Sequence, residues 1–276
     1  MIPGINPFLL SNLNSSLILS IAIVILMGTM SLAGLIIPEQ VYPSKGAIQS
    51  FMVNDVINLF IVLPVLLGSM WLARRGKLVG ALFWPGALLT VFYNYIAYVF
   101  GIPFRSFTFA YLMLVALSAY TMYDILKKIN KLSVKAQLDG IVPVKLGGWF
   151  LLLFGVVFLL RAADMLSQVM RNQAALPSSD TGVLIADVIL SLLWIAGGIL
   201  LLRSAPLGFV SGLGLLFAAS MLFLGLILFL LLQPLLTDAT FVISDFLVVF
   251  LMGLICFIPF VLFARGVLSI ENSSKV

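Results

Sequence analysis

The chain has 276 residues, of which 63% are hydrophobic and 9% are charged, and its mean hydropathy is +1.24. Soluble domains are about 45–50% apolar and about 25% charged, so this composition excludes a soluble globular protein and indicates a polytopic membrane protein. The sequence has no histidine, which excludes histidine-ligated haem, HExxH zinc sites and nucleophiles activated by histidine. Its one cysteine, Cys256, lies in an apolar run, so we expect no disulfide within the chain.

A transmembrane helix needs about 20 consecutive apolar residues, and the chain contains eight segments that meet this requirement. We therefore predict an all-α integral membrane protein with eight transmembrane helices. The predicted spans are Leu17–Ile37, Val53–Ala73, Leu78–Phe100, Phe107–Leu126, Gly147–Gln168, Gly182–Leu202, Gly208–Leu232 and Phe241–Ala264. The isolated prolines within them, Pro64, Pro85 and Pro259, predict local kinks rather than broken helices.

Lysine and arginine are distributed unevenly over the two ends of these spans. With a cytoplasmic N-terminus, eleven of them fall on the cytoplasmic side and three, Lys45, Arg105 and Arg171, fall on the other. Because basic residues are retained on the cytoplasmic side, this bias predicts a multi-pass protein of the plasma (inner) membrane with both termini in the cytoplasm. The net charge of +5 is then a topology signal, so we expect the lipid bilayer, and no nucleic acid, as a partner.

The second half of the chain is similar to the first when the sequence is shifted by 132 residues without gaps. This shift places Asp55 on Asp187, and the pair Gly76 and Gly80 on Gly208 and Gly212. Four spans per unit leave both copies in one orientation, which predicts a parallel 4+4 repeat. The predicted units are a first four-helix unit at 1–126, a basic cytoplasmic linker at 127–146 and a second four-helix unit at 147–276.

Three segments resemble an uncharacterised family of multi-pass membrane proteins from prokaryotes. They read NDVINLFIVLPVLLGSMWLARRG, FWPGALLTVFYNYIAYVFG and DVILSLLWIAGGILLLRSAPLGF. The resemblance implies the fold and the membrane location, and it carries no assigned activity. In that family a polar residue or histidine can precede the acid that matches Asp187, whereas this chain has Leu184 at that position.

Five ionisable side chains, Asp55, Arg161, Asp164, Asp187 and Asp245, lie in the predicted spans toward the outer leaflet. Charge inside a span is costly and is usually paired or placed in a polar cavity. Together with nearby polar residues they form the candidate ligand-binding set: Asp55, Asn58, Tyr93, Asn94, Arg161, Asp164, Asp187 and Asp245. A lone arginine at the depth of Arg161 would cost about 2.5–3.5 kcal/mol on the insertion scale. We therefore expect Arg161 to lie inside the bundle, in an ion pair with at least one of these acids.

Three interpretations of this set remain open. In the first, the charges only fix helix packing in a structural or interaction protein. In the second, they line a polar cavity open to the outside, in which Arg161 faces an anionic or zwitterionic ligand. In the third the protein is an enzyme, because Tyr123–Asp124 is similar to half of the intramembrane aspartyl protease motif. The GxGD half is missing, since Leu215 follows Gly214, and an ion pair with Lys127 or Lys128 accounts for Asp124.

We favour a non-enzymatic membrane protein, either a small transporter or a ligand-binding subunit with an outward-facing polar site. Its ligand would be a small molecule or an ion, and we expect no cofactor and no metal centre. The alternative is the structural or interaction protein described above.

The charge bias makes the topology testable. A reporter fused after Val276 is expected to be active only if it is a cytoplasmic reporter. Cysteines introduced at Asn172 and Ser178 are expected to react with an impermeant thiol reagent added outside intact cells. Reaction of these cysteines only after the cells are opened would reverse the orientation.

Overall fold

The computed structural model describes residues 11–173 and 176–273, and these residues form helices and no strands. Eight helical segments are long and apolar enough to cross a membrane, which confirms the predicted all-α, eight-span fold. They are α1 (Asn14–Ile36), a second span made of α3 (Lys45–Ile57), η1 (Asn58–Val62) and α4 (Leu63–Arg74), then α5 (Leu78–Gly101), α6 (Thr108–Lys128), α8 (Val144–Asn172), α9 (Ser178–Leu202), α10 (Pro206–Leu236) and α11 (Ile243–Ser273). Two short helices, α2 (Pro38–Val41) and α7 (Lys131–Leu138), lie between spans.

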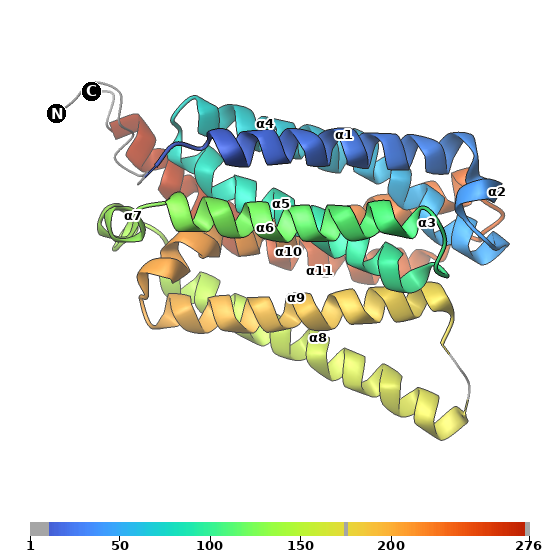
Figure 1. Ribbon diagram of the computed structural model, residues 1–276. Coiled ribbons are helices and arrows are strands. Elements are labelled where there is room, and N and C mark those ends of the chain that lie inside the picture. The colour runs from blue at the N-terminus through green and yellow to red at the C-terminus, as the bar shows by residue number, and fades with distance from the viewer. Residues whose placement is uncertain (1–10, 174–175, 274–276) are drawn as a thin grey trace.

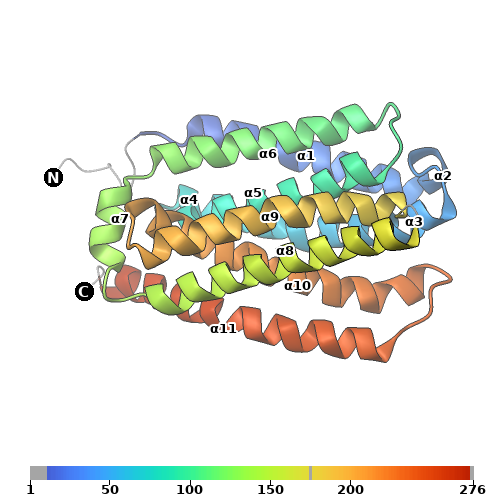
Figure 2. The ribbon, with the colours of Figure 1, turned by 90° about the horizontal axis from the view of Figure 1, so that it is seen from below.

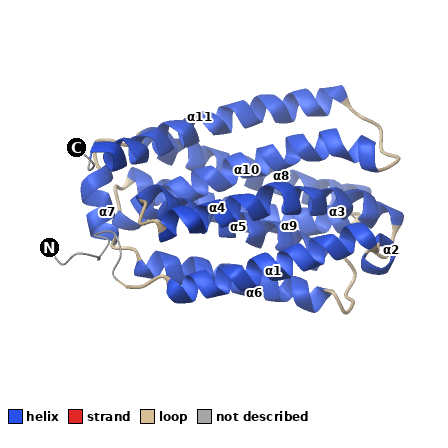
Figure 3. Cartoon of the chain, turned by 90° about the horizontal axis from the view of Figure 1, so that it is seen from above, coloured by secondary structure: helices blue, strands red, loops and turns tan. Residues whose placement is uncertain are grey.

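The spans run side by side in one elongated bundle (Figure 1). One end, here called the terminal end, holds the start of α1, the end of α11 and α7. The opposite end, here called the distal end, holds α2 and the connection from α8 to α9 (Figure 1). Views from below and above place α1 and α6 on one side of the bundle, α10 and α11 on the other, and α5 between them (Figures 2 and 3).

The central helix α5 has the largest buried share of the eight spans and contacts α4, α6, α9 and α10. It crosses α10 where Gly86 and Gly214 meet. A Cβ added to Gly86 would lie 2.8 Å from the Cα of Gly214, a distance that carbon atoms of real side chains do not reach. In lipid the hydrophobic effect does not drive helices together, so transmembrane helices associate in part through such close backbone contacts between small residues. The core of the bundle is therefore built on this crossing.

The turn from α4 to α5 and the turn from α9 to α10 share one hydrogen-bond pattern. In each, three successive N–H groups, at Arg75–Lys77 and at Arg203–Ala205, donate to carbonyls four, three and five residues back. The middle residue has a positive φ in both turns, 76° at Gly76 and 50° at Ser204. Each residue of the second turn lies 128 positions after its counterpart, as Arg203 does after Arg75.

The same separation of 128 relates Gly80 to Gly208, which approach the backbones of α4 and α9 in the same way. At this corner the pairing of Gly76 with Gly208 is therefore wrong, because the shift of 132 is one helical turn too long. Leucine-rich helices tolerate a shift of one turn, since residues four apart share a face. The 4+4 repeat as a whole stays a prediction, as do the unit boundaries at 126 and 147.

Two features of the spans were not expected from the sequence. The second span begins at Lys45 rather than Val53, because the Ser44 side chain accepts a hydrogen bond from the Ala47 N–H (3.2 Å) and caps the helix. It is also interrupted by the π-helical segment η1, where isolated kinks were predicted. In addition, the basic linker contains α7, which Asn130 caps by accepting from the Ser133 N–H at 3.2 Å.

The crossing of α5 and α10 yields a stability prediction. Gly86→Ala is expected to destabilise the protein by about 1–3 kcal/mol, because its Cβ must displace backbone atoms of α10. In the control, Gly68→Ala on α4, the new Cβ meets nothing within 4 Å, and the change is expected to be neutral or stabilising. Thermal unfolding in one detergent would measure both. Equal stability of the two variants would contradict the close crossing.

Candidate functional site

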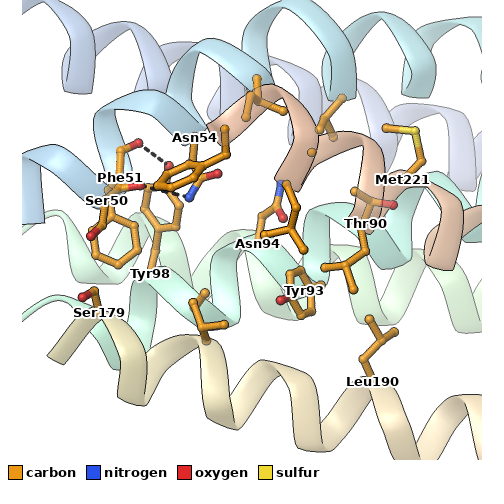
Figure 4. Close-up of a pocket in the computed structure, with 18 of the residues that line it drawn as sticks. Ser50, Phe51, Asn54, Thr90, Tyr93, Asn94, Tyr98, Ser179, Leu190 and Met221 are labelled. Atoms are coloured by element: carbon orange, nitrogen blue, oxygen red, sulfur yellow. Dashed lines mark hydrogen bonds between the residues drawn. The ribbon is translucent and has the colours of Figure 1, made fainter. Parts of the chain in front are cut away.

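A cavity of about 330 Å³ lies between α3, η1, α5, α9 and α10, in the half of the bundle toward the distal end (Figure 4). On α5 its lining follows one helical face, with Thr90, Tyr93, Asn94, Ala97 and Tyr98 at the spacing of i, i+3, i+4, i+7 and i+8. The other polar lining residues are Ser50, Asn54, Ser179, Asp180 and Gln233, and the remaining wall is mostly aliphatic.

Asp55 lies behind the cavity wall, in a cluster of tyrosines. Its side chain is 1% exposed and accepts hydrogen bonds from the hydroxyls of Tyr42 and Tyr98, the latter at 3.0 Å. Burial, together with the Asp55 carboxyl, raises the pKa of the Tyr42 phenol far above its usual range, so Tyr42 remains a hydrogen-bond donor. None of the ion pairs among the described residues involves Asp55.

A close neighbour limits the space around this carboxyl. Gly34 on α1 packs against Asp55 and Tyr42 so closely that a Cβ would overlap the carboxyl oxygen. The Asp55 cluster is thus filled by protein atoms, and its hydrogen bonds join the loop before α3, α3 and α5.

Asp187, on α9, forms the second buried acid. It accepts a hydrogen bond from the Tyr93 hydroxyl (2.8 Å) and forms an ion pair with Nη1 of Arg161 (3.2 Å). The predicted ion pair of Arg161 with one of the acids is therefore confirmed. The expectation that Arg161 lies inside the bundle is wrong, because its side chain is 57% exposed while that of Asp187 is 6% exposed.

The reason for this exposure is the path of α8. Toward the distal end α8 diverges from α9 (Figure 1), and most of its residues from Leu159 onward are exposed or half-buried. Arg161 therefore reaches Asp187 from the edge of the bundle and is not among the residues that line the cavity.

The structure does not bring the other two charged candidates to this region. Asp164 is exposed on α8 and contacts Gln168 (2.7 Å) and Arg171 (3.8 Å) of the same helix. Asp245 is exposed near the start of α11 and accepts from the neighbouring Ser244 hydroxyl at 3.2 Å.

Asn58 opens the π-helical segment η1 and is fully buried. Its Oδ1 accepts a hydrogen bond from Asn94 Nδ2 at 2.8 Å, while its own Nδ2 has no hydrogen-bond partner. Irregular helical segments of this kind are frequent at functional sites. Of the eight candidates, only Tyr93 and Asn94 line the cavity. Asp187 and Asn58 are hydrogen-bonded to these two residues, and Asp55 is hydrogen-bonded to Tyr98, which also lines the cavity.

No protein-family profile, curated protein or solved structure matches the chain. The resemblance to a prokaryotic membrane-protein family stays a prediction, and the site is interpreted from its geometry alone. Among residues 11–173 and 176–273, no group of three or more histidine, cysteine, aspartate or glutamate side chains could hold a metal ion.

Asp124, the acid of the protease-like dipeptide, lies at the terminal end. It forms an ion pair with Lys128 (2.6 Å) and accepts a hydrogen bond from the Ser16 hydroxyl (2.7 Å). These contacts tie the end of α6 to the start of α1, which is the helix-end ion pair expected from the sequence.

The Asp187 cluster yields a second stability prediction. Arg161→Ala is expected to cost about 1–3 kcal/mol, because it leaves the buried Asp187 carboxylate with only the Tyr93 hydrogen bond. Asp187→Asn in the same chain is expected to restore part of this loss, since an amide needs no cation. The unfolding midpoints of both single variants and the double variant measure the coupling. Additive losses in the double variant would show that the pair contributes nothing to stability.

Proposed function

We propose that this protein binds a small molecule within the membrane, in the cavity between α3, α5, α9 and α10, as a ligand-binding membrane subunit or a small transporter. The observation that supports this proposal is the cavity itself. Its volume of about 330 Å³ falls within the range of about 300–1,000 Å³ that is usual for ligand sites. Such sites combine a mostly apolar wall with a few convergent polar groups, and this wall has that composition.

The polar and exposed lining residues gather toward the distal end, where the cavity meets the surface. Asp180 there is exposed, and Ser50, Asn54, Ser179 and Gln233 are half-buried. Deeper in the bundle the wall is formed by side chains such as Leu89, Leu190 and Met221. With the terminal end in the cytoplasm of a plasma-membrane protein, as the charge bias predicts, this polar mouth faces outward.

In this proposal the buried acids are structural. Asp55 and Asp187 do not line the cavity, and each accepts a hydrogen bond from a tyrosine that does. The rival interpretation, a purely structural or interaction protein, is favoured by the same hydrogen bonds. The two differ in whether the cavity is accessible to solutes. The proposed function does not include an enzymatic activity.

Accessibility of the cavity can be measured without knowing the ligand. Cysteine at Asn54, in a chain carrying Cys256→Ala, is expected to react with a small impermeant thiol reagent added outside intact cells. Gly225 also lines the cavity, and a Cβ there meets nothing within 4 Å, so the side chain introduced by Gly225→Leu is expected to occupy part of the cavity. This second change is expected to slow the reaction by about tenfold or more, since one extra methylene in a fitted pocket already costs about 1–3 kcal/mol.

Two controls complete the experiment. A Cβ added at Gly68 also meets no atom within 4 Å, but Gly68 lies outside the cavity lining. Gly68→Leu is therefore expected to leave the reaction rate unchanged. Cysteine at Leu67, an exposed apolar position on α4, is expected to remain unreactive in lipid. A cysteine at position 54 that reacts no faster than one at position 67 would contradict an accessible cavity and support the structural interpretation.

A further inference from the structure

Three hydroxyl groups of the cavity wall, on Thr90, Tyr93 and Tyr98, donate their protons in hydrogen bonds to the protein. Thr90 Oγ1 donates to the carbonyl of Gly86 (3.1 Å), and the Tyr93 hydroxyl donates to Asp187 (2.8 Å). The Tyr98 hydroxyl lies 3.0 Å from both Asp55 Oδ1 and the carbonyl of Phe51. A hydroxyl has one proton and two lone pairs. Each of these three hydroxyl oxygens therefore retains acceptor capacity only.

The amide side chains of the wall are oriented in the same sense. Asn54 Nδ2 donates to the Ser50 carbonyl (3.1 Å), Asn94 Nδ2 to Asn58 Oδ1 (2.8 Å) and Gln233 Nε2 to the Gln49 carbonyl (3.5 Å). In each case the side-chain nitrogen donates one hydrogen bond to the protein. The amide then retains one N–H donor and its oxygen as an acceptor. Acceptors thus exceed donors in the wall, and the hydroxyl groups account for the excess.

The charge of the wall is negative, which, like an excess of acceptors, favours a positively charged ligand. Among residues 11–173 and 176–273, Asp180 is the only charged residue that lines the cavity, and no lysine or arginine does. Its carboxylate contacts the Ser179 hydroxyl at 3.5 Å, and it lies in the exposed first turn of α9 at the mouth. Arg161, the cation expected at the site, is instead paired with Asp187 at the edge of the bundle.

Four aromatic side chains, Phe51, Tyr93, Tyr98 and Phe229, also contribute to the wall. Aromatic rings attract ammonium groups through their quadrupole, by about 0.5–1 kcal/mol at exposed sites and more where water is excluded. Aromatic carbon, acceptor oxygens and one carboxylate together suit a cation that has an apolar body. They suit an anion poorly, because a buried negative charge would find no cation in this wall.

We propose, on the basis of the ligand-binding function proposed above, that the cavity takes an organic cation, a protonated amine or quaternary ammonium with a small apolar body. The ammonium group donates hydrogen bonds to the acceptors near the mouth, beside Asp180. The apolar body lies against the aliphatic wall formed by Leu89, Leu190, Met221 and Leu222. The proposed ligand is therefore a cation, and not the anion or zwitterion that the sequence predicted from Arg161.

Three probes that share a phenyl ring and a short alkyl chain test the charge. 2-Phenylethylammonium, 2-phenylethanol and 3-phenylpropionate would be titrated by calorimetry into the full-length protein in nanodiscs of zwitterionic lipid. The ammonium probe is expected to bind about tenfold tighter than the alcohol, and the carboxylate is expected not to bind. Tighter binding of the alcohol or the carboxylate, or no binding of the ammonium, would overturn the proposed ligand class.

Two pairs of variants locate the ammonium. Asp180→Asn is expected to weaken ammonium binding by about fivefold and to leave the alcohol unchanged, since the pair is exposed and worth about 1 kcal/mol at most. Asp164→Asn, at an exposed acid outside the lining, is the matched control and is expected to change neither. Gly225→Leu is expected to abolish binding of the probe, and Gly68→Leu to preserve it.

These outcomes separate the ligand class from the function. Equal loss of ammonium and alcohol affinity in Asp180→Asn, or unchanged ammonium binding in Gly225→Leu, would contradict charge recognition in this cavity. The cavity's accessibility, on which the proposed function depends, is measured independently by the reaction of the cysteine at position 54. An accessible cavity that rejects the ammonium probe would retain the function and discard the cation.

Discussion

The contact of Gly86 with Gly214 is the constraint on which the rest of the structure depends. Two helices whose backbones touch at one point must separate on either side of it, unless large side chains fill the gap. The cavity begins where this separation begins, since its lining starts at Leu89 on α5 and at Ala218 on α10, about one turn beyond the crossing. The glycines therefore both hold the central pair together and set the depth of the cavity floor. A larger residue at either position would move the two walls apart along their whole length.

The buried acids then fix the walls in place. Tyr93 and Tyr98 lie on the same helix and reach acids on opposite neighbours, Asp187 on α9 and Asp55 on α3. Because an unsatisfied carboxyl would be costly at this depth, each hydrogen bond holds a neighbouring helix at a defined rotation and height relative to α5. The two acids are satisfied differently: Asp187 has a cation at the edge of the bundle, whereas the hydrogen-bond donors around Asp55 are hydroxyl groups. Both arrangements stabilise the frame around a space that protein atoms do not fill.

The sequence predicted the spans and the need of Arg161 for an acid, because both follow from the cost of placing polar groups in hydrocarbon. Its prediction that Arg161 lies inside the bundle was wrong, since the position of Arg161 depends on how far α8 diverges from α9, and no local pattern determines this divergence. The polar stripe of Thr90, Tyr93, Asn94 and Tyr98 could have been predicted from the sequence, because its spacing alone places these residues on one face of α5. Asp180 and Gln233 carried no such signal, as polar residues near span ends are ordinary. The register of the two similar turns was missed by one helical turn, for the reason that leucine-rich faces repeat every turn.

The structural and the ligand-binding interpretations are alternatives, but both depend on the same hydrogen bonds, which join the buried acids to residues of the cavity wall. A tyrosine hydroxyl that donates a hydrogen bond to a buried carboxyl retains only its lone pairs, so it can act toward any further group only as an acceptor. The hydrogen bonds that satisfy Asp55 and Asp187 therefore leave the hydroxyl oxygens of Tyr98 and Tyr93, two residues of the cavity wall, with acceptor capacity only. Asn58 accepts a hydrogen bond from Asn94, which keeps one further N–H and its side-chain oxygen. The network that holds the helices together thus also contributes to the polarity of the wall, and the excess of acceptors favours a group that donates hydrogen bonds.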